Sequence, residues 1–319
     1  MFICTFQAEN HFLEKMFVLC QFLFTMSMFI LPVVVYNICV TAIIMPFTHI
    51  RRREKMGKIK VTIWNEFVHE RDDNPVGEYV RNIYPDGIHE FLKEKLQADD
   101  LEIRAVSLNM PDQGLPDEVL NDTDVLMWWG HCAHHLVDDE LVARIRFRVL
   151  HGMGLIVMHS GHYSKVFRTM MGTACRLRWR EVGEKERLWV VDPTHPITQG
   201  VPETFTLPHS EMYGERFDIP EDGKILFMSW FEGGNVFRSG VLFQRDYGKI
   251  FYFSPGHETY PIYHDENILK VLGNAIRFVN PACGVLPDRT TPTPQSHEPI
   301  TTENPLTEVK TACLHQQKK

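Results

Sequence analysis

The alternation of short β-rich runs with amphipathic helical patterns between residues 56 and 280 constrains this chain more than any other feature. The β-rich runs of its first half lie at 58–64, 102–108, 124–129 and 154–158. Those of its second half lie at 188–191, 224–230, 240–243 and 249–253. The helical patterns, with apolar residues three or four positions apart, lie at 84–97, 138–150 and 266–279. Strands that alternate with helices form parallel sheets covered on both faces. The sequence therefore predicts an α/β fold, a doubly wound and mainly parallel sheet of the flavodoxin-like type, with β insertions in its second half.

Two segments of different composition flank the predicted domain. Residues 1–55 include an apolar stretch at 16–47 that exceeds the ~20 residues needed to span a bilayer. The basic residues that follow it, Arg51 and Arg52 among them, would place the domain on the cytoplasmic side of a membrane. A membrane anchor and a translated extension outside the working protein both remain open interpretations. Residues 281–319, rich in Pro, Thr, Gln and Lys, are predicted to be a disordered tail.

Charge and cysteine usage exclude several classes of function. The formal net charge is −8, and an acidic domain repels phosphate backbones, so we expect no nucleic-acid partner. Residues 56–280 contain only Cys132 and Cys175 and no C-x-x-C pair, which argues against a disulfide framework and a zinc–thiolate site. We therefore expect a reducing, cytoplasmic environment for the domain. We also expect no nucleotide cofactor, and contact with a membrane only through 16–47.

Histidines follow three of the predicted strands. His131 follows the third strand, His159 the fourth and His257 the last, and ligands of doubly wound sheets bind at such carboxyl ends. Three histidines with an open fourth position are typical of a catalytic zinc site. Glu211 or Glu258 could complete the set or act as a base. The sequence thus predicts a divalent metal, zinc in the first place, although hydrogen-bonded pocket histidines are the alternative interpretation.

Five segments resemble a known family, and together they span most of the predicted domain. They are 128–131 (WWGH), 154–162 (GLIVMHSGH), 184–191 (EKERLWVV), 211–220 (EMYGERFDIP) and 255–261 (PGHETYP). In these segments the chain resembles the ThuA family of trehalose-utilisation proteins. The resemblance implies a fold like that of the class I glutamine amidotransferases. It also implies a sugar substrate, a disaccharide or a 3-keto-glycoside, and hydrolysis, lyase-type cleavage or isomerisation next to a carbonyl.

The same resemblance shows what the chain lacks. Class I amidotransferases carry a nucleophilic cysteine on the sharp turn after the fourth strand, where this chain has His159 followed by Ser160. Glutamine hydrolysis through a thiolate is therefore not supported. The candidate catalytic residues are His159, Ser160, Glu211, His257 and Glu258.

Two alternatives to a metal-dependent sugar enzyme stay open at this point. One is a serine hydrolase in which Ser160 pairs with His257 and Glu258, although the Gly-x-Ser-x-Gly pattern is absent. The other is a sugar-binding module without catalysis.

Substrate contacts are predicted from polar groups near strand ends and from aromatic residues near carboxylates, since sugars stack an apolar face on aromatic rings. The predicted contacts are Asn65, His69, Glu70, His162, Arg187, Tyr213, Trp230 and Tyr260. For the charged run 185–187, an exposed turn is the competing interpretation.

Overall fold

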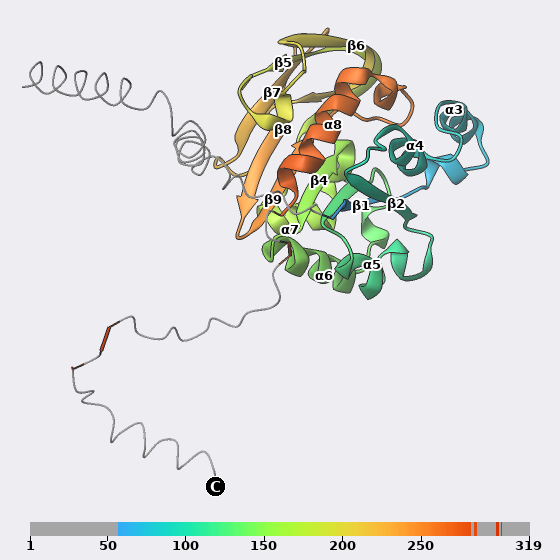
Figure 1. The fold of residues 1–319 in the computed structure, drawn as a ribbon. Helices are drawn as coiled ribbons and strands as arrows, with labels where there is room; N and C mark the ends of the chain where they lie inside the picture. Colours follow the sequence, from blue (N-terminus) through green and yellow to red (C-terminus); the bar gives the residue numbers. More distant parts are fainter. Residues whose placement is uncertain (1–56, 282–283, 286–297, 300, 302–319) are drawn as a thin grey trace, which may run out of the picture. The chain divides into compact units, whose positions relative to one another are not determined.

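The computed structural model describes residues 57–281, 284–285, 298–299 and 301, and its central feature is a nine-stranded sheet (Figure 1). The strand order is β2-β1-β3-β4-β9-β8-β7-β5-β6. The strands are β1 (Ile59–Asn65), β2 (Leu101–Ser107), β3 (Val125–Trp129), β4 (Gly154–Met158), β5 (Arg178–Val190), β6 (Thr204–Gly214), β7 (Lys224–Phe231), β8 (Val236–Arg245) and β9 (Gly248–Phe253).

The sheet has a parallel half and an antiparallel half. Strands β2, β1, β3, β4 and β9 pair in parallel, whereas β9, β8, β7, β5 and β6 pair antiparallel. The parallel half confirms the predicted doubly wound sheet, and the antiparallel half corresponds to the predicted β insertions. Because β1, β3, β4 and β9 run in one direction, their carboxyl ends meet at one edge, where the site described below lies.

Helices cover both faces of the parallel half (Figure 1). They are α3 (Pro75–Ile83), α4 (Ile88–Lys95), α5 (Asp117–Asn121), α6 (Asp139–Leu150), α7 (Lys165–Met171) and α8 (Glu266–Val279). Side chains of a strand alternate between faces, so Leu126 and Trp128 of β3 pack in the core with α6 and α7. Their neighbours Val125 and Met127 pack in the core with α4 and α8.

The antiparallel strands are longer than the sequence predicts. The expected strand at 188–191 is the end of β5, which begins at Arg178, and β6 was not expected at all. The competing interpretation of 185–187 as an exposed turn is wrong, because these residues lie within β5 and Glu186 is 1% exposed. Because β5 lies between β6 and β7, its inward-facing residues are covered even where the sequence is strongly charged.

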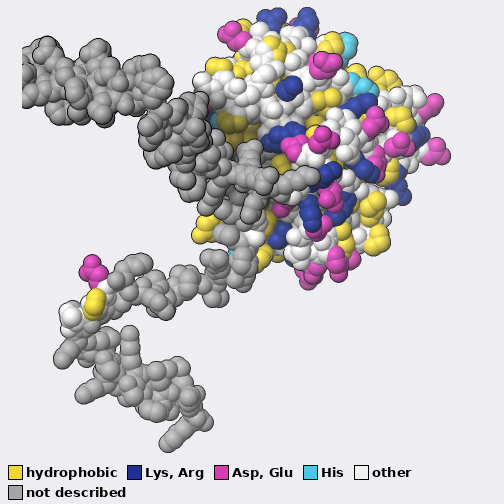
Figure 2. All heavy atoms as spheres, viewed as in Figure 1, with side chains coloured by type: hydrophobic (Ala, Val, Ile, Leu, Met, Phe, Trp, Pro, Cys, Tyr) yellow, Lys and Arg dark blue, Asp and Glu magenta, His cyan; other side chains and the backbone are white. Residues whose placement is uncertain are grey.

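The structure tests the predictions about surface charge and a membrane segment only in part. No helix of the described ranges is long and apolar enough to cross a membrane, and the stretch 16–47 lies outside those ranges. On the face seen in Figure 2, acidic and basic side chains are interspersed over the described elements.

Candidate functional site

Four side chains from different strands converge at the carboxyl edge of the parallel half. His131, His159, Glu211 and His257 each offer one donor atom, and these atoms lie within 4.8 Å of one another. His131 follows β3, His159 follows β4, His257 lies in the loop after β9, and Glu211 lies on β6. The sheet thus assembles the three histidines that the sequence predicted to converge, together with one of the two predicted carboxylates. We refer to these four residues as the four-donor cluster.

His159 is held in place by its backbone and by one hydrogen bond. It begins the turn η4 (His159–Tyr163) with a φ of 50°, a strained value for a residue with a side chain and one typical of a nucleophile elbow. Its Nδ1 lies 2.9 Å from the Ser254 carbonyl oxygen, which can only accept, so Nδ1 carries the proton. In the neutral ring Nε2 then presents a lone pair, and it lies 3.1 Å from Glu211 Oε2. A lone pair and a carboxylate this close repel unless a proton or another cation lies between them.

His131 is oriented in the same way by a buried carboxylate. Its Nδ1 lies 3.0 Å from Glu258 Oε1, which leaves Nε2 as the free ring nitrogen. Burial alone would lower the pKa of His131, but the hydrogen bond to Glu258 outweighs burial and raises this pKa. Glu258 is 1% exposed, and although burial opposes ionisation, the bonds from His131 and His69 hold its pKa well below its usual range. Histidines whose second nitrogen is fixed by a carboxylate or a carbonyl are the usual ligands of metal ions.

His257 can present either tautomer to the cluster. Its Nδ1 lies 3.2 Å from the Thr259 backbone nitrogen and 2.8 Å from Thr259 Oγ1. The backbone N–H donates to Nδ1 in one tautomer, and Oγ1 accepts from Nδ1 in the other, which frees the Nε2 lone pair for a cation. Burial lowers the pKa of His257 to about 4, so the ring is neutral near pH 7. The loop is fixed by Gly256, whose φ of 149° brings its Cα close to Tyr263, and whose carbonyl accepts from Trp129 Nε1 at 3.0 Å.

Two buried polar atoms of the cluster have no hydrogen-bond partner within the described part of the chain. They are Glu211 Oε2 and His257 Nε2, which lie 4.0 Å apart. Burial would raise the pKa of Glu211, but His159 and the other histidines outweigh it and lower this pKa, so the carboxylate is charged. Unsatisfied buried groups are costly, and three imidazoles with one carboxylate are a donor set that zinc prefers. The residues present therefore fit a divalent cation.

A second group of possible donors is already linked by hydrogen bonds. His69, His131 and Glu258 also lie within 4.8 Å, but Glu258 Oε1 already accepts from both imidazoles. The contact of Cys132 Sγ with His69 Nε2, together with Glu258, raises the pKa of His69 to about 11. The carboxylate of Glu66 accepts from the backbone N–H groups of residues 131–133 and so fixes the loop after β3. These contacts orient His131 and support the four-donor cluster from outside.

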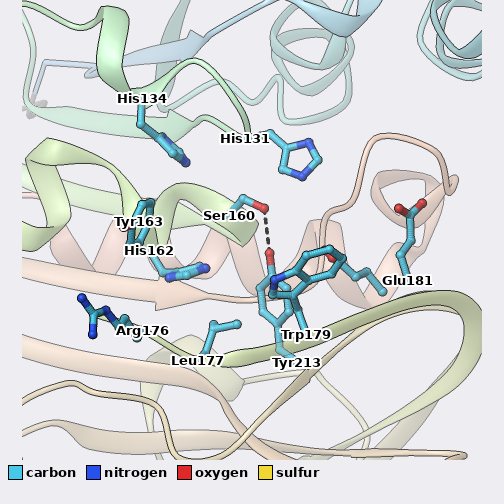
Figure 3. Close-up of a pocket in the computed structure, with 11 residues that line it drawn as sticks. His131, His134, Ser160, His162, Tyr163, Arg176, Leu177, Trp179, Glu181 and Tyr213 are labelled. Atoms are coloured by element: carbon cyan, nitrogen blue, oxygen red, sulfur yellow. Dashed lines mark hydrogen bonds between the residues drawn. The ribbon is translucent and has the colours of Figure 1, made fainter. Parts of the chain in front are cut away.

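A pocket of about 490 Å³ opens beside the cluster (Figure 3). Its walls are His131, His134, Ser160, His162, Tyr163, Arg176, Leu177, Trp179, Glu181, Glu211 and Tyr213. The Tyr213 ring stacks on His159 with centroids 5.0 Å apart, and its hydroxyl lies 2.7 Å from Ser160 Oγ. A bound molecule in this pocket would therefore reach the cluster directly.

Comparison with known proteins identifies the family. Residues 60–279 match the family described as "ThuA: Trehalose utilisation". This chain belongs to the ThuA family. A comparison with curated proteins gives no match.

Several solved structures are similar to this ThuA-family domain. A ThuA-like protein from Bacteroides uniformis has a TM-score of 0.52 at 16% identity, covering 72% of this chain and 95% of its own. A second, from Parabacteroides merdae, has a TM-score of 0.49 at 12% identity, covering 73% and 94%. A protein of Salmonella typhimurium described as cytoplasmic has a TM-score of 0.48 at 13% identity, covering 70% and 100%. The first of these supports the fold, and none of them identifies a substrate.

The predicted substrate contacts of the ThuA-family domain fall into two groups. His162 and Tyr213 line the pocket. The other predicted contacts, none of which lines it, are Asn65, His69, Glu70, Arg187, Trp230 and Tyr260.

Those outside the pocket have other partners. Asn65 Nδ2 donates to Glu70 Oε1 at 2.7 Å, and both side chains are buried. Arg187 lies over the Trp230 ring at 5.9 Å, where β5 pairs with β7. Tyr260 packs beside His257, with ring centroids 5.5 Å apart.

Ser160 is not arranged as the nucleophile of a triad. Its hydroxyl has Tyr213 as its hydrogen-bond partner, whereas Nδ1 of His257 faces Thr259. Glu258 lies 3.7 Å from His257 Nδ1, and its bonds go to His69 and His131. The geometry thus gives no support to the serine-hydrolase alternative.

Proposed function

We propose that this ThuA-family protein is a metal-dependent, sugar-processing enzyme that acts on a disaccharide or 3-keto-glycoside. The observation that carries the proposal is the four-donor cluster, in which two buried atoms without a hydrogen-bond partner in the described chain lie 4.0 Å apart beside an open pocket. The Nδ1 atoms of His131 and His159 each donate to an acceptor, which leaves Nε2 of both rings available to bind a cation. His131, His159, Glu211 and His257 would hold the ion, with zinc favoured by the donor set.

When bound, the ion would supply Lewis-acid polarisation of a carbonyl oxygen of the substrate. The chain's own residues would bind the sugar and move the proton. Glu181 is a carboxylate of the pocket wall, exposed enough to meet a substrate, and it lies 3.6 Å from His257 Nε2. In the proposal it removes the proton from the carbon next to the carbonyl, a step that needs a base within hydrogen-bond reach.

Tyr213 would keep its proton and serve as a donor. Burial raises the pKa of Tyr213 well above its usual value, so its hydroxyl stays neutral. This hydroxyl lies 3.4 Å from His159 Nε2 and 2.7 Å from Ser160 Oγ. The pair is placed to donate a hydrogen bond to a substrate oxygen that approaches the cluster.

The test combines metal content with turnover. We expect about one equivalent of zinc per chain by elemental analysis of the purified protein, and turnover of 3-keto-trehalose. His159→Ala should lose most of the metal and the turnover, whereas His151→Ala, at the end of α6, should retain both. Glu181→Gln should retain the metal and lose roughly 100-fold or more in kcat, as expected for a general base.

Two outcomes would contradict the proposal. Full metal content in His159→Ala would show that this histidine is a pocket residue only. Sugar binding without turnover in the metal-loaded protein would favour the sugar-binding module instead.

A further inference from the structure

One wall of the pocket comes from a single short segment of the chain. Arg176, Leu177, Trp179 and Glu181 follow one another there, and Figure 3 shows Arg176 and Glu181 at opposite ends of the row of labelled side chains. Trp179 and Glu181 are two positions apart on β5, so they share one face of the strand. The wall therefore presents a cation, an apolar surface and a carboxylate in that order.

The middle of the wall is an indole that is unusually exposed. Trp179 is 67% exposed, although it pairs with the buried Tyr213 of β6. Large aromatic side chains usually bury most of their surface, so an exposed one at a polar pocket is a candidate binding platform. Its flat apolar face matches the face of a sugar ring, while the cluster and Tyr213 reach hydroxyl or carbonyl oxygens.

The end of the wall at Arg176 is positively charged, and no counter-ion for it lies within the described part of the chain. The Arg176 side chain is exposed, and no hydrogen bond or ion pair to it is found among the described residues. A second guanidinium, that of Arg168, lies 4.9 Å from the ring centre of Tyr163, another wall residue.

The two carboxylates that line the pocket lie away from Arg176, near the four-donor cluster. Glu211 is part of the four-donor cluster, and Glu181 lies 3.6 Å from His257 of the same cluster. The pocket is thus polarised: the Arg176 guanidinium lies at one end, and the two carboxylates of the lining lie toward the other. A ligand that satisfies this arrangement carries a negative group at one end and neutral oxygens at the other.

We propose that the pocket binds a sugar ring carrying an anionic group, with the ring over Trp179 and the anionic group at Arg176. This inference rests on the proposed function and adds to it the kind of sugar that the Arg176 end of the pocket would favour. A guanidinium binds carboxylate and phosphate in the same forked geometry, so the two kinds of anionic sugar share the chemistry that is proposed.

The test is calorimetric titration of the full chain with D-glucose, D-glucuronate and D-glucose 6-phosphate. We expect at least one anionic probe to bind about tenfold or more tightly than glucose, since each charge-assisted bond is worth about that factor. Arg176→Gln should remove this preference and leave glucose binding unchanged. Trp179→Ala should weaken all probes alike.

Two matched variants serve as controls. Arg178→Gln changes an exposed arginine of the same segment that does not line the pocket, and it should alter nothing. Trp189→Ala removes an exposed indole of the same strand, 43% exposed and away from the pocket, and should also leave binding intact.

The outcomes separate this inference from the proposed function. Preference for glucuronate or for glucose 6-phosphate supports it and identifies the anionic group. Equal binding of glucose and both anions, a preference that survives Arg176→Gln, or no binding of any probe overturns it. Turnover of 3-keto-trehalose, measured independently, decides in each case whether the proposed function stands.

Discussion

Glu186 makes the stability of this domain depend on pH in a direction that can be worked out from its surroundings. The side chain lies between β6 and β7, where Oε2 accepts from Ser210 Oγ at 2.7 Å and Oε1 from Ser229 Oγ at 2.6 Å. Burial raises the pKa of Glu186 from 4.5 to about 7, and the two hydroxyl donors only partly offset it. The folded state therefore binds this proton more tightly than the unfolded chain does. The stabilisation of the fold by the protonated Glu186 is therefore fully present below about pH 4.5, and it is lost as the pH rises through about 7.

The size of the effect follows from the same two pKa values. A change from 4.5 to about 7 corresponds to about 3 kcal/mol, at about 1.4 kcal/mol for each pH unit. Glutamine has nearly the same shape and no charge to bury, and its amide can donate to the serine hydroxyl oxygens. Glu186→Gln should therefore gain about 3 kcal/mol in unfolding free energy, relative to wild type, between about pH 4.5 and about pH 8.

Urea unfolding of the full chain, followed by circular dichroism at several pH values, measures this difference. Subtracting the variant's free energy of unfolding from that of wild type at each pH cancels the contributions of the other titrating groups. Glu203→Gln, at an exposed position before β6, is the matched control for replacing a carboxylate by an amide. A difference between wild type and Glu186→Gln that does not change with pH would refute the assignment of the raised pKa to this carboxyl.

Two further predictions concern the loops that carry the site. Gly256→Ala should lower the free energy of unfolding by about 2 kcal/mol or more and reduce metal content, because φ is 149° there and the added Cβ would lie 2.1 Å from the Tyr263 hydroxyl. Gly273→Ala in α8 is the control and should be neutral or stabilising. Equal stability of the two variants by urea unfolding would contradict this prediction. Ser160→Ala should lose activity only in part, and the wild-type protein should not react with a fluorophosphonate probe, because the Ser160 hydroxyl is hydrogen-bonded to Tyr213. Stoichiometric labelling of the wild type that is absent from the alanine variant would restore the serine-hydrolase alternative.

The parallel half of the sheet could be predicted because its sequence pattern has a single physical solution. The run at 154–158 coincides with β4, and the helical pattern at 266–279 coincides with α8. Strands buried on both faces need apolar residues at every position, and covering helices need them every third or fourth position. Once these strands are parallel, residues after their carboxyl ends must lie near one another. Histidines 28 and 98 positions apart in the chain could therefore be expected to meet, as His131, His159 and His257 do.

The antiparallel half could not be predicted with the same rules, and the pocket wall was missed as a result. Residues 178–187 are mostly charged, so their strand period is hidden unless the pairing with β6 is known. With the strand taken to begin near Leu188, Trp179 had no reason to face a site. Given a strand from Arg178, the alternation of side chains places Trp179 and Glu181 together on one face and Arg178 on the other. The pairing of Trp179 with Tyr213 then places that face beside His159, because Tyr213 stacks on the imidazole. The substrate-facing residues are thus decided by strand register, which comes from partners far along the chain and leaves little trace in the local sequence.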